Sequence, residues 1–183
     1  MQMQDKPNDL LLLAGKILTI LMQAFLALAA TAIAIAAPLM LIFNEKVSIE
    51  FAEQVGEVSG GTFIAITLGL MVIAFGIIAA AFIFFGKLRA IIASVGEGDP
   101  FVPENADRLN LMAWLLLGIQ ILMIPAMGIG LMFAKWAESV ENAQVTIDAG
   151  LDIEGVLMVI VLFILARVFK HGADMRDDLE GTV

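Results

Sequence analysis

Hydrophobic residues in this chain are gathered into long runs that almost lack charge, and short polar stretches separate the runs. The first run extends from about residue 17 to 43, the second covers residues 63–86, and the third covers residues 109–134. A helix of about 20 apolar residues crosses a hydrocarbon core roughly 30 Å thick. Each of these three runs is therefore predicted to form a transmembrane helix.

A fourth apolar segment is shorter, and its interpretation is open. Residues 155–166 are free of charge and lie between Glu154 and Arg167, which is a short stretch for a complete span. An arginine at a helix end can extend its charged group to the lipid headgroups. We therefore expect a fourth span over residues 151–169, with a re-entrant or interfacial segment as the alternative.

The overall composition agrees with a membrane protein. Hydrophobic residues make up 61% of the chain and the mean hydropathy is +0.97, whereas soluble proteins are about 45–50% apolar. The first run is much longer than the roughly 7–15 apolar residues of a signal peptide, so we expect an uncleaved anchor. The predicted fold class is an all-α integral membrane protein, a four-transmembrane-helix bundle forming one domain over residues 1–183.

Lysine and arginine are unevenly divided between the two sides that these spans define. Lys46 and Lys135 lie on one side. The other side carries Lys6, Lys16, Lys87, Arg89, Arg108, Arg167, Lys170 and Arg176. The positive-inside rule places the more basic side in the cytoplasm. We therefore expect both termini, the loop 87–108 and the tail 170–183 to be cytoplasmic.

The two loops expected on the outer side, residues 44–60 and 135–154, are rich in carboxylates. Within them, residues 46–50 (KVSIE) and 145–148 (VTID) alternate β-branched and polar residues, which predicts short strands. Clustered carboxylates are suited to a divalent cation or a basic peptide. Neither loop has EF-hand spacing, so we favour a solvated acidic face over a cation site.

Polar residues inside the three long predicted spans are few and uncharged. Charged side chains within spans are typical of ion-coupled transport, and the best candidate for one is Glu154, if the fourth span starts early. Gln23 and Gln120 are expected to bond across helices, and the alternative is that they line a ligand cavity. Gly76 and Ala80 have the spacing of small residues at helix contacts, which serves packing within the bundle or a homo-oligomer.

Several kinds of chemistry lack the residues they require. The chain has no cysteine and one histidine, His171, so neither a thiolate site nor a multi-histidine metal site can form. A net charge of −9 argues against direct nucleic-acid binding. No nucleophile–base pair or phosphate-binding loop is present. We therefore expect no catalytic residues, no metal, no cofactor and no enzymatic activity.

The stretch GEGDPFVPENADRL interrupts the hydrophobic pattern between the second and third spans. Residues 87–95 have apolar positions at helical spacing and are predicted to extend the second helix. Glycines including Gly98 then end that helix, an Asp-Pro pair opens a turn, and Pro103 begins the next helix. Phe101 has no such local role, so its ring is expected either to pack back on the bundle or to meet a partner.

The segments GDPFVPENADRLNLMAWLLLGIQIL and MRDDLEGTV carry a resemblance to a known family. They resemble the bacterial membrane proteins grouped as domain of unknown function 2975, over nearly the whole chain. The family pattern falls on Gly98, Pro100, Phe101, Asn105, Leu179, Thr182 and Val183. The tail departs from it, because it reads EGTV where many members read nearer DLTV. Members often accompany a small helix-turn-helix regulator of the Cro/repressor type. The resemblance thus implies a bacterial inner-membrane protein with a cytoplasmic DNA-binding partner.

These expectations combine into one functional hypothesis. The chain is expected to be a regulatory or sensory protein of the bacterial inner membrane that docks a helix-turn-helix regulator through residues 96–109 and the tail. Phe101, Arg108 and the tail carboxylates would make the contacts. Two alternatives stay open: a small transporter or channel subunit, and a structural accessory subunit of a membrane complex.

Overall fold

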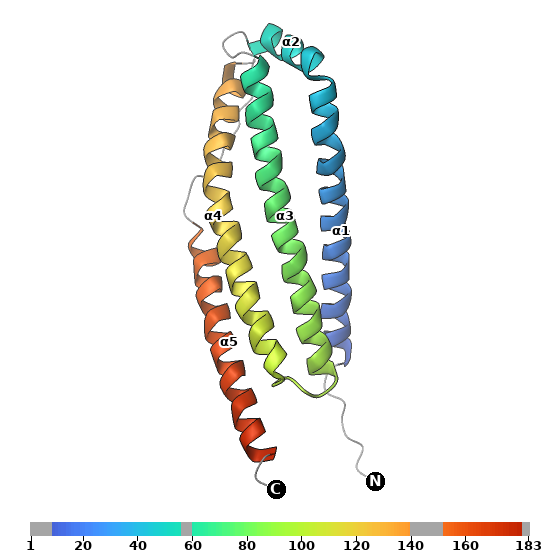
Figure 1. The fold of residues 1–183 in the computed structure, drawn as a ribbon, viewed down its shortest axis with the longest axis vertical. Coiled ribbons are helices and arrows are strands. Elements are labelled where there is room, and N and C mark those ends of the chain that lie inside the picture. The colour runs from blue at the N-terminus through green and yellow to red at the C-terminus, as the bar shows by residue number, and fades with distance from the viewer. Residues whose placement is uncertain (1–8, 56–59, 140–151, 181–183) are drawn as a thin grey trace. The chain divides into compact units, whose positions relative to one another are not determined.

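The computed structural model describes residues 9–55, 60–139 and 152–180, and the regular structure of this part of the chain is helical. The helices are shown in Figure 1 and are α1 (Asp9–Ile42), α2 (Asn44–Val55), α3 (Gly60–Gly96), α4 (Pro103–Ser139) and α5 (Ile153–Glu180). For these residues the predicted all-α class is confirmed.

Three of the described helices are long and apolar enough to cross a membrane. The qualifying segments are Leu10–Ile42 in α1, Gly60–Gly96 in α3 and Pro103–Ala134 in α4. These segments match the three long runs seen in the sequence, except that the first ends at Ile42, one residue before the predicted end. Helix α5 does not belong to this group, because its uninterrupted apolar part is short and charges follow from Arg167 onward. A fourth span therefore stays a prediction.

The prediction of a strand over residues 46–50 is wrong, because these residues belong to helix α2. The Ser48 hydroxyl donates a hydrogen bond to the Asn44 carbonyl one turn earlier, and Glu45 lies in the first turn of the helix, where the helix dipole favours an acid. The segment also lacks glycine and proline and contains good helix formers, which outweigh a short alternation. The second predicted strand, residues 145–148, lies outside the described residues.

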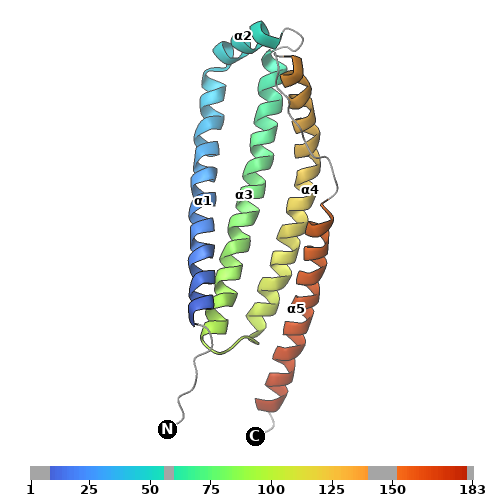
Figure 2. The ribbon, with the colours of Figure 1, turned by 180° about the vertical axis from the view of Figure 1, so that it is seen from behind.

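The described residues form two compact units, and α1, α3 and α4 each contribute to both. The first unit contains residues 9–27, 80–117 and 153–180. Its buried core comes from α3, α4 and α5 and comprises Ile91, Leu109, Met112, Ala113, Leu162 and Ala166. Seen from behind in Figure 2, α5 lies along the first half of α4. The rings of Trp114 and Phe163 meet edge to face there, with centroids 5.5 Å apart.

The second unit contains residues 28–55, 60–79, 118–139 and 152. Helix α2 connects α1 to α3 at one end of it (Figure 1). A Cβ atom at Gly76 would lie 3.4 Å from Leu122 Cδ1, an ordinary van der Waals distance, so α3 and α4 pack together here but the contact does not require a glycine. The rings of Phe63 and Phe133 also join these two helices, with centroids 5.7 Å apart.

Many large apolar side chains point away from the protein. Leu28, Val72 and Ile124, on three different helices, are 72%, 73% and 68% exposed. Soluble monomers rarely expose contiguous apolar surface on this scale. Lipid contact explains why the exterior is apolar, and the three long helices are therefore those of a membrane protein.

Helix α5 includes residues from two segments that were predicted to be separate, the fourth span and the tail. It runs without a break from Ile153 to Glu180, so residues 153–169 of the predicted span and residues 170–180 of the predicted tail form one continuous helix. Residues 181–183 lie outside the described part of the chain, and these include Thr182 and Val183.

Candidate functional site

The turn between α3 and α4 is closed by backbone hydrogen bonds. Gly98 has a φ angle of +86°, a conformation that residues with a Cβ atom rarely adopt. Its amide donates to the Val95 carbonyl at 3.1 Å, and the Asp99 amide donates to the Ser94 carbonyl at 3.0 Å. Helix α3 therefore continues through residues 87–95 and ends at a glycine turn, and α4 begins at Pro103, as the sequence predicts.

Asn105 holds this turn from inside. Its side chain is fully buried, and the amide nitrogen donates to Ser94 Oγ at 2.7 Å and to the Pro100 carbonyl at 2.9 Å. Its amide oxygen accepts a hydrogen bond from Arg108 Nη1 at 2.7 Å. Asn105 and Arg108 were predicted to contact a partner. In this structure Asn105 instead joins the end of α3, the turn and the start of α4, and Arg108 contributes to the same network.

Phe101 packs against α5. Its ring centroid lies 5.4 Å from that of Phe169, and a Cβ atom at Gly172 would come within 2.6 Å of Phe101 Cδ1. The lack of a side chain at Gly172 therefore lets the ring lie against the helix backbone. Phe101 remains 42% exposed, so one face of the ring packs on the bundle and another faces outward.

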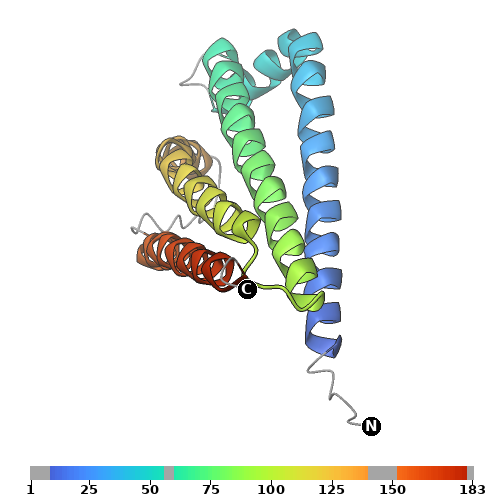
Figure 3. The ribbon, with the colours of Figure 1, turned by 60° about the horizontal axis from the view of Figure 1, so that its bottom comes forward.

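An ion pair adds a second contact between the turn and α5. Arg176 Nη1 donates to Asp99 Oδ1. Both side chains are partly exposed, and such pairs contribute little stability. The pair therefore serves mainly to orient the turn relative to α5. We call this ion pair, together with the packing of Phe101 on Phe169 and Gly172, the turn–α5 contact. Figure 3 shows α5 passing close to the α3–α4 turn.

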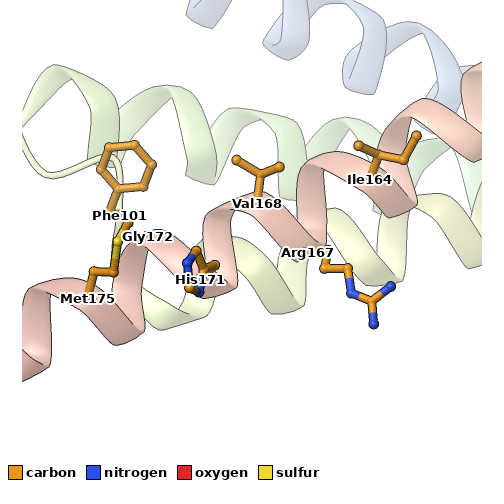
Figure 4. A pocket seen from close by; sticks show the side chains of 7 residues that line it. All are labelled: Phe101, Ile164, Arg167, Val168, His171, Gly172 and Met175. Atoms are coloured by element: carbon orange, nitrogen blue, oxygen red, sulfur yellow. The ribbon is translucent and has the colours of Figure 1, made fainter.

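An open groove of about 540 Å³ lies beside the turn–α5 contact. Figure 4 shows Phe101 reaching over from the turn while the remaining lining residues lie along α5. The groove is lined by Phe101, Ile164, Arg167, Val168, His171, Gly172 and Met175. Its walls are mainly apolar, its cationic group is Arg167, and no carboxylate lines it.

A second groove, of about 400 Å³, lies between the start of α1 and the end of α3. It is lined by Leu12, Leu13, Lys16, Ile92, Ala93, Gly96 and Glu97. A Cβ atom at Gly15 would lie 3.2 Å from Ile92 Cδ1, so the two helices are already close beside it.

The two intramembrane glutamines line neither groove. Gln23 Nε2 donates to the Phe82 carbonyl on α3 at 3.3 Å, so its predicted bond across helices is confirmed. Gln120 Nε2 donates to Asp152 Oδ2 at 2.8 Å. Both amides are thus used in contacts within the protein, although Asp152 precedes α5, so the Gln120 bond does not join two helices.

The remaining predicted site residues are dispersed. Leu179 lies near the end of α5 and is 73% exposed, while Thr182 and Val183 lie outside the described residues. Sequence reasoning missed the α5 side of the turn–α5 contact. One signal was available for Gly172, because a lone glycine inside a helical pattern often marks a close approach. No local pattern indicated Arg176.

Across residues 9–55, 60–139 and 152–180, no three His, Asp or Glu side chains are grouped so that they could hold a metal ion. Neither the curated proteins nor the solved structures include a match to this chain. One family model does match, that of "Protein of unknown function (DUF2975)", and it covers residues 44–183, from α2 to the C-terminus. The match includes the turn, Asn105 and α5, and leaves α1 outside. This chain therefore belongs to the DUF2975 family, as its turn and tail motifs indicated.

Proposed function

We propose that this chain is a non-enzymatic regulatory or sensory protein of the bacterial inner membrane, which docks a cytoplasmic partner beside the turn–α5 contact. The proposal places both termini and the α3–α4 turn in the cytoplasm. The division of lysine and arginine between the two sides supports that orientation.

The observation that carries the proposal is that large apolar side chains are exposed among the charged residues of the α3–α4 turn and the end of α5. Leu179 is 73% exposed on a turn of α5 that also carries Asp177 and Asp178, and Phe101 is 42% exposed in the polar α3–α4 turn, where it packs on Phe169 of the same helix. Lipid contact accounts for exposed apolar residues within the spans. It does not account for Leu179, which follows a run of charged residues that begins at Arg167. Apolar side chains exposed among charges are typical of protein-binding surfaces.

The turn–α5 contact supports the sensory part of the proposal. The Phe101–Phe169 packing and the Asp99–Arg176 pair couple α5 to the turn that joins α3 and α4. A displacement of α5 along or across the membrane would therefore change the surface that carries Leu179. This gives a physical route from the spans to the docking surface.

The partner proposed is a helix-turn-helix regulator, in keeping with the proteins that accompany this family. Such a regulator would be held at the membrane by the docking surface and would bind DNA through its own basic surface. The chain itself has a net charge of −9, which suits a basic partner and opposes direct DNA binding.

The test is co-purification of the full chain with a helix-turn-helix regulator encoded beside it, after extraction in mild detergent. Leu179→Gln is expected to reduce capture at least fivefold, since truncating a central apolar contact costs about 1 kcal/mol or more. Leu11→Gln is the matched control, because Leu11 has the same side chain and the same 73% exposure but lies on α1.

Equal capture by both variants and by the unmodified chain would contradict docking at the end of α5. Equal loss in both variants would also contradict it, because the effect would then follow from a general change in surface polarity. A selective loss in Leu179→Gln supports the proposal only when both variants give the same yield and helical signal in circular dichroism.

A further inference from the structure

We propose that the groove along α5 is a binding site for an anionic phospholipid of the cytoplasmic leaflet. The acyl chain would lie against Ile164 and Val168, and the phosphate would be bound by Arg167 with His171 beside it. This inference depends on α5 entering the membrane from the cytoplasmic side. It does not depend on the docking of a regulator.

The first argument is the position of the groove along α5. On the N-terminal side of Arg167, α5 exposes apolar side chains around most of its circumference, including Leu157 at 56% and Ile160 at 50%. Val159, Leu162 and Ala166 form the buried face. On the C-terminal side charges are frequent. The groove lies where these two parts meet, so one end of it is at acyl-chain depth and the other is at headgroup depth.

The second argument is charge. Arg167, Lys170 and His171 follow one another at i, i+3 and i+4, so they lie close together on one face of the helix. No carboxylate lines the groove. Within the described part of the chain, no ion pair or hydrogen bond engages the Arg167 side chain. An arginine that is available at the interface can hold a phosphate with two parallel hydrogen bonds.

The positive region is also limited in length, which favours a single headgroup. Asp174 follows His171 by one turn toward the C-terminus, and Asp177 and Asp178 come after it. A phosphate is therefore favoured beside Arg167 and disfavoured further along α5. Toward Ile164 the wall of the groove is apolar, so the tail of a phospholipid bound at Arg167 would extend in that direction.

The main competing occupant is an apolar segment of a protein partner. Two observations favour lipid over protein. Ile164 belongs to the apolar part of α5 that precedes Arg167, which a cytoplasmic protein does not reach, and the groove is open to the surface. The volume of about 540 Å³ falls within the roughly 300–1,000 Å³ that is usual for small-molecule sites.

The experiment compares the full chain and its variants by native mass spectrometry in detergent, titrated with phosphatidylglycerol or with phosphatidylcholine. The unmodified chain is expected to bind phosphatidylglycerol more tightly. Arg167→Gln should weaken phosphatidylglycerol binding about fivefold, as expected for one basic residue at an anionic lipid surface. It should weaken phosphatidylcholine binding less, because the choline cation offsets the charge of the phosphate that Arg167 would bind. Arg89→Gln, which removes an exposed arginine of α3 outside the groove, is the control for general electrostatic attraction.

A second pair of variants tests the apolar end. Val168→Trp should fill the groove and lower the binding of both lipids, whereas Ile160→Trp, on the exposed face of α5 but outside the groove, should not. Equal affinity of the unmodified chain for the two lipids would overturn the proposal, and so would equal effects of Arg167→Gln and Arg89→Gln. Loss of regulator capture in Val168→Trp with lipid binding intact would show that a protein occupies the groove instead.

Discussion

Replacing Asn105 by alanine is expected to loosen the α3–α4 turn while leaving the helices formed. The Asn105 side chain is 0% exposed and makes hydrogen bonds to Ser94 Oγ, the Pro100 carbonyl and Arg108. Alanine is a good helix former, so the substitution leaves the helical conformation of α4 intact. What is lost is the connection between the end of α3, the turn and the first turn of α4.

The magnitude follows from the three bonds that are lost. Each hydrogen bond contributes about 1 kcal/mol net, and a buried group left without its partner costs more than an exposed one. Pro100 and Arg108 are only partly buried, so water can replace part of what is lost there. We therefore expect the opening free energy of the turn to fall by about 2 kcal/mol, which corresponds to roughly a 30-fold change in the opening equilibrium.

Hydrogen–deuterium exchange measures this change directly. The amides to follow are those of Gly98, Asp99 and Asn105, which donate to backbone carbonyls that close the turn. The control is Asn110→Ala, because Asn110 lies on the same helix and is exposed. If exchange in the turn rises no more in Asn105→Ala than in Asn110→Ala, the inference that Asn105 holds the turn is wrong.

Two further predictions concern the turn–α5 contact. Gly172→Ala should displace the Phe101 ring from α5 and raise hydrogen exchange in the turn, because the new methyl group would lie 2.6 Å from Phe101 Cδ1. Gly118→Ala is the control, because nothing lies within 4 Å of a Cβ atom there, and it should be neutral or stabilising in a thermal melt. Equal behaviour of the two variants would contradict the close approach of Phe101 to Gly172. In a double-mutant cycle, Asp99→Asn and Arg176→Gln should show a coupling energy below about 1 kcal/mol that declines with added salt. A larger coupling that does not depend on salt would mean that the pair is shielded from solvent.

The sequence predicted the long helices well, because their signal is local and repeated. Apolar runs of sufficient length led to α1, α3 and α4, and the start of α4 at Pro103 followed from the chemistry of one residue. The hydrophobic pattern was least informative where only a few residues distinguished a strand from a helix. Residues 46–50 fit a strand template over a very short stretch, yet they form part of the twelve-residue helix α2.

The site was predicted in part, and the missing part depends on tertiary contacts. Gly98, Pro100 and Phe101 were identified as a turn with one unexplained aromatic ring, and the structure shows where one face of that ring packs. The sequence could not show that Asn105 is buried, since a polar residue in the first turn of a helix is usually solvated. Its burial depends on Ser94, eleven positions earlier, being brought beside it by the turn.

Because the turn is held from within, the way a partner can use Phe101 is restricted. The face of the ring that packs on Phe169 is available only if the turn–α5 contact opens, and opening also separates Asp99 from Arg176. A partner that binds the exposed face together with Leu179 leaves the contact intact and acts as a passive tether. A partner that needs the packed face competes with α5 for Phe101, so its binding would depend on how firmly α5 is held against the turn. In this second mode the partner and α5 exclude each other at Phe101, and a lipid bound in the proposed groove beside Phe101 would favour the ring packed on α5.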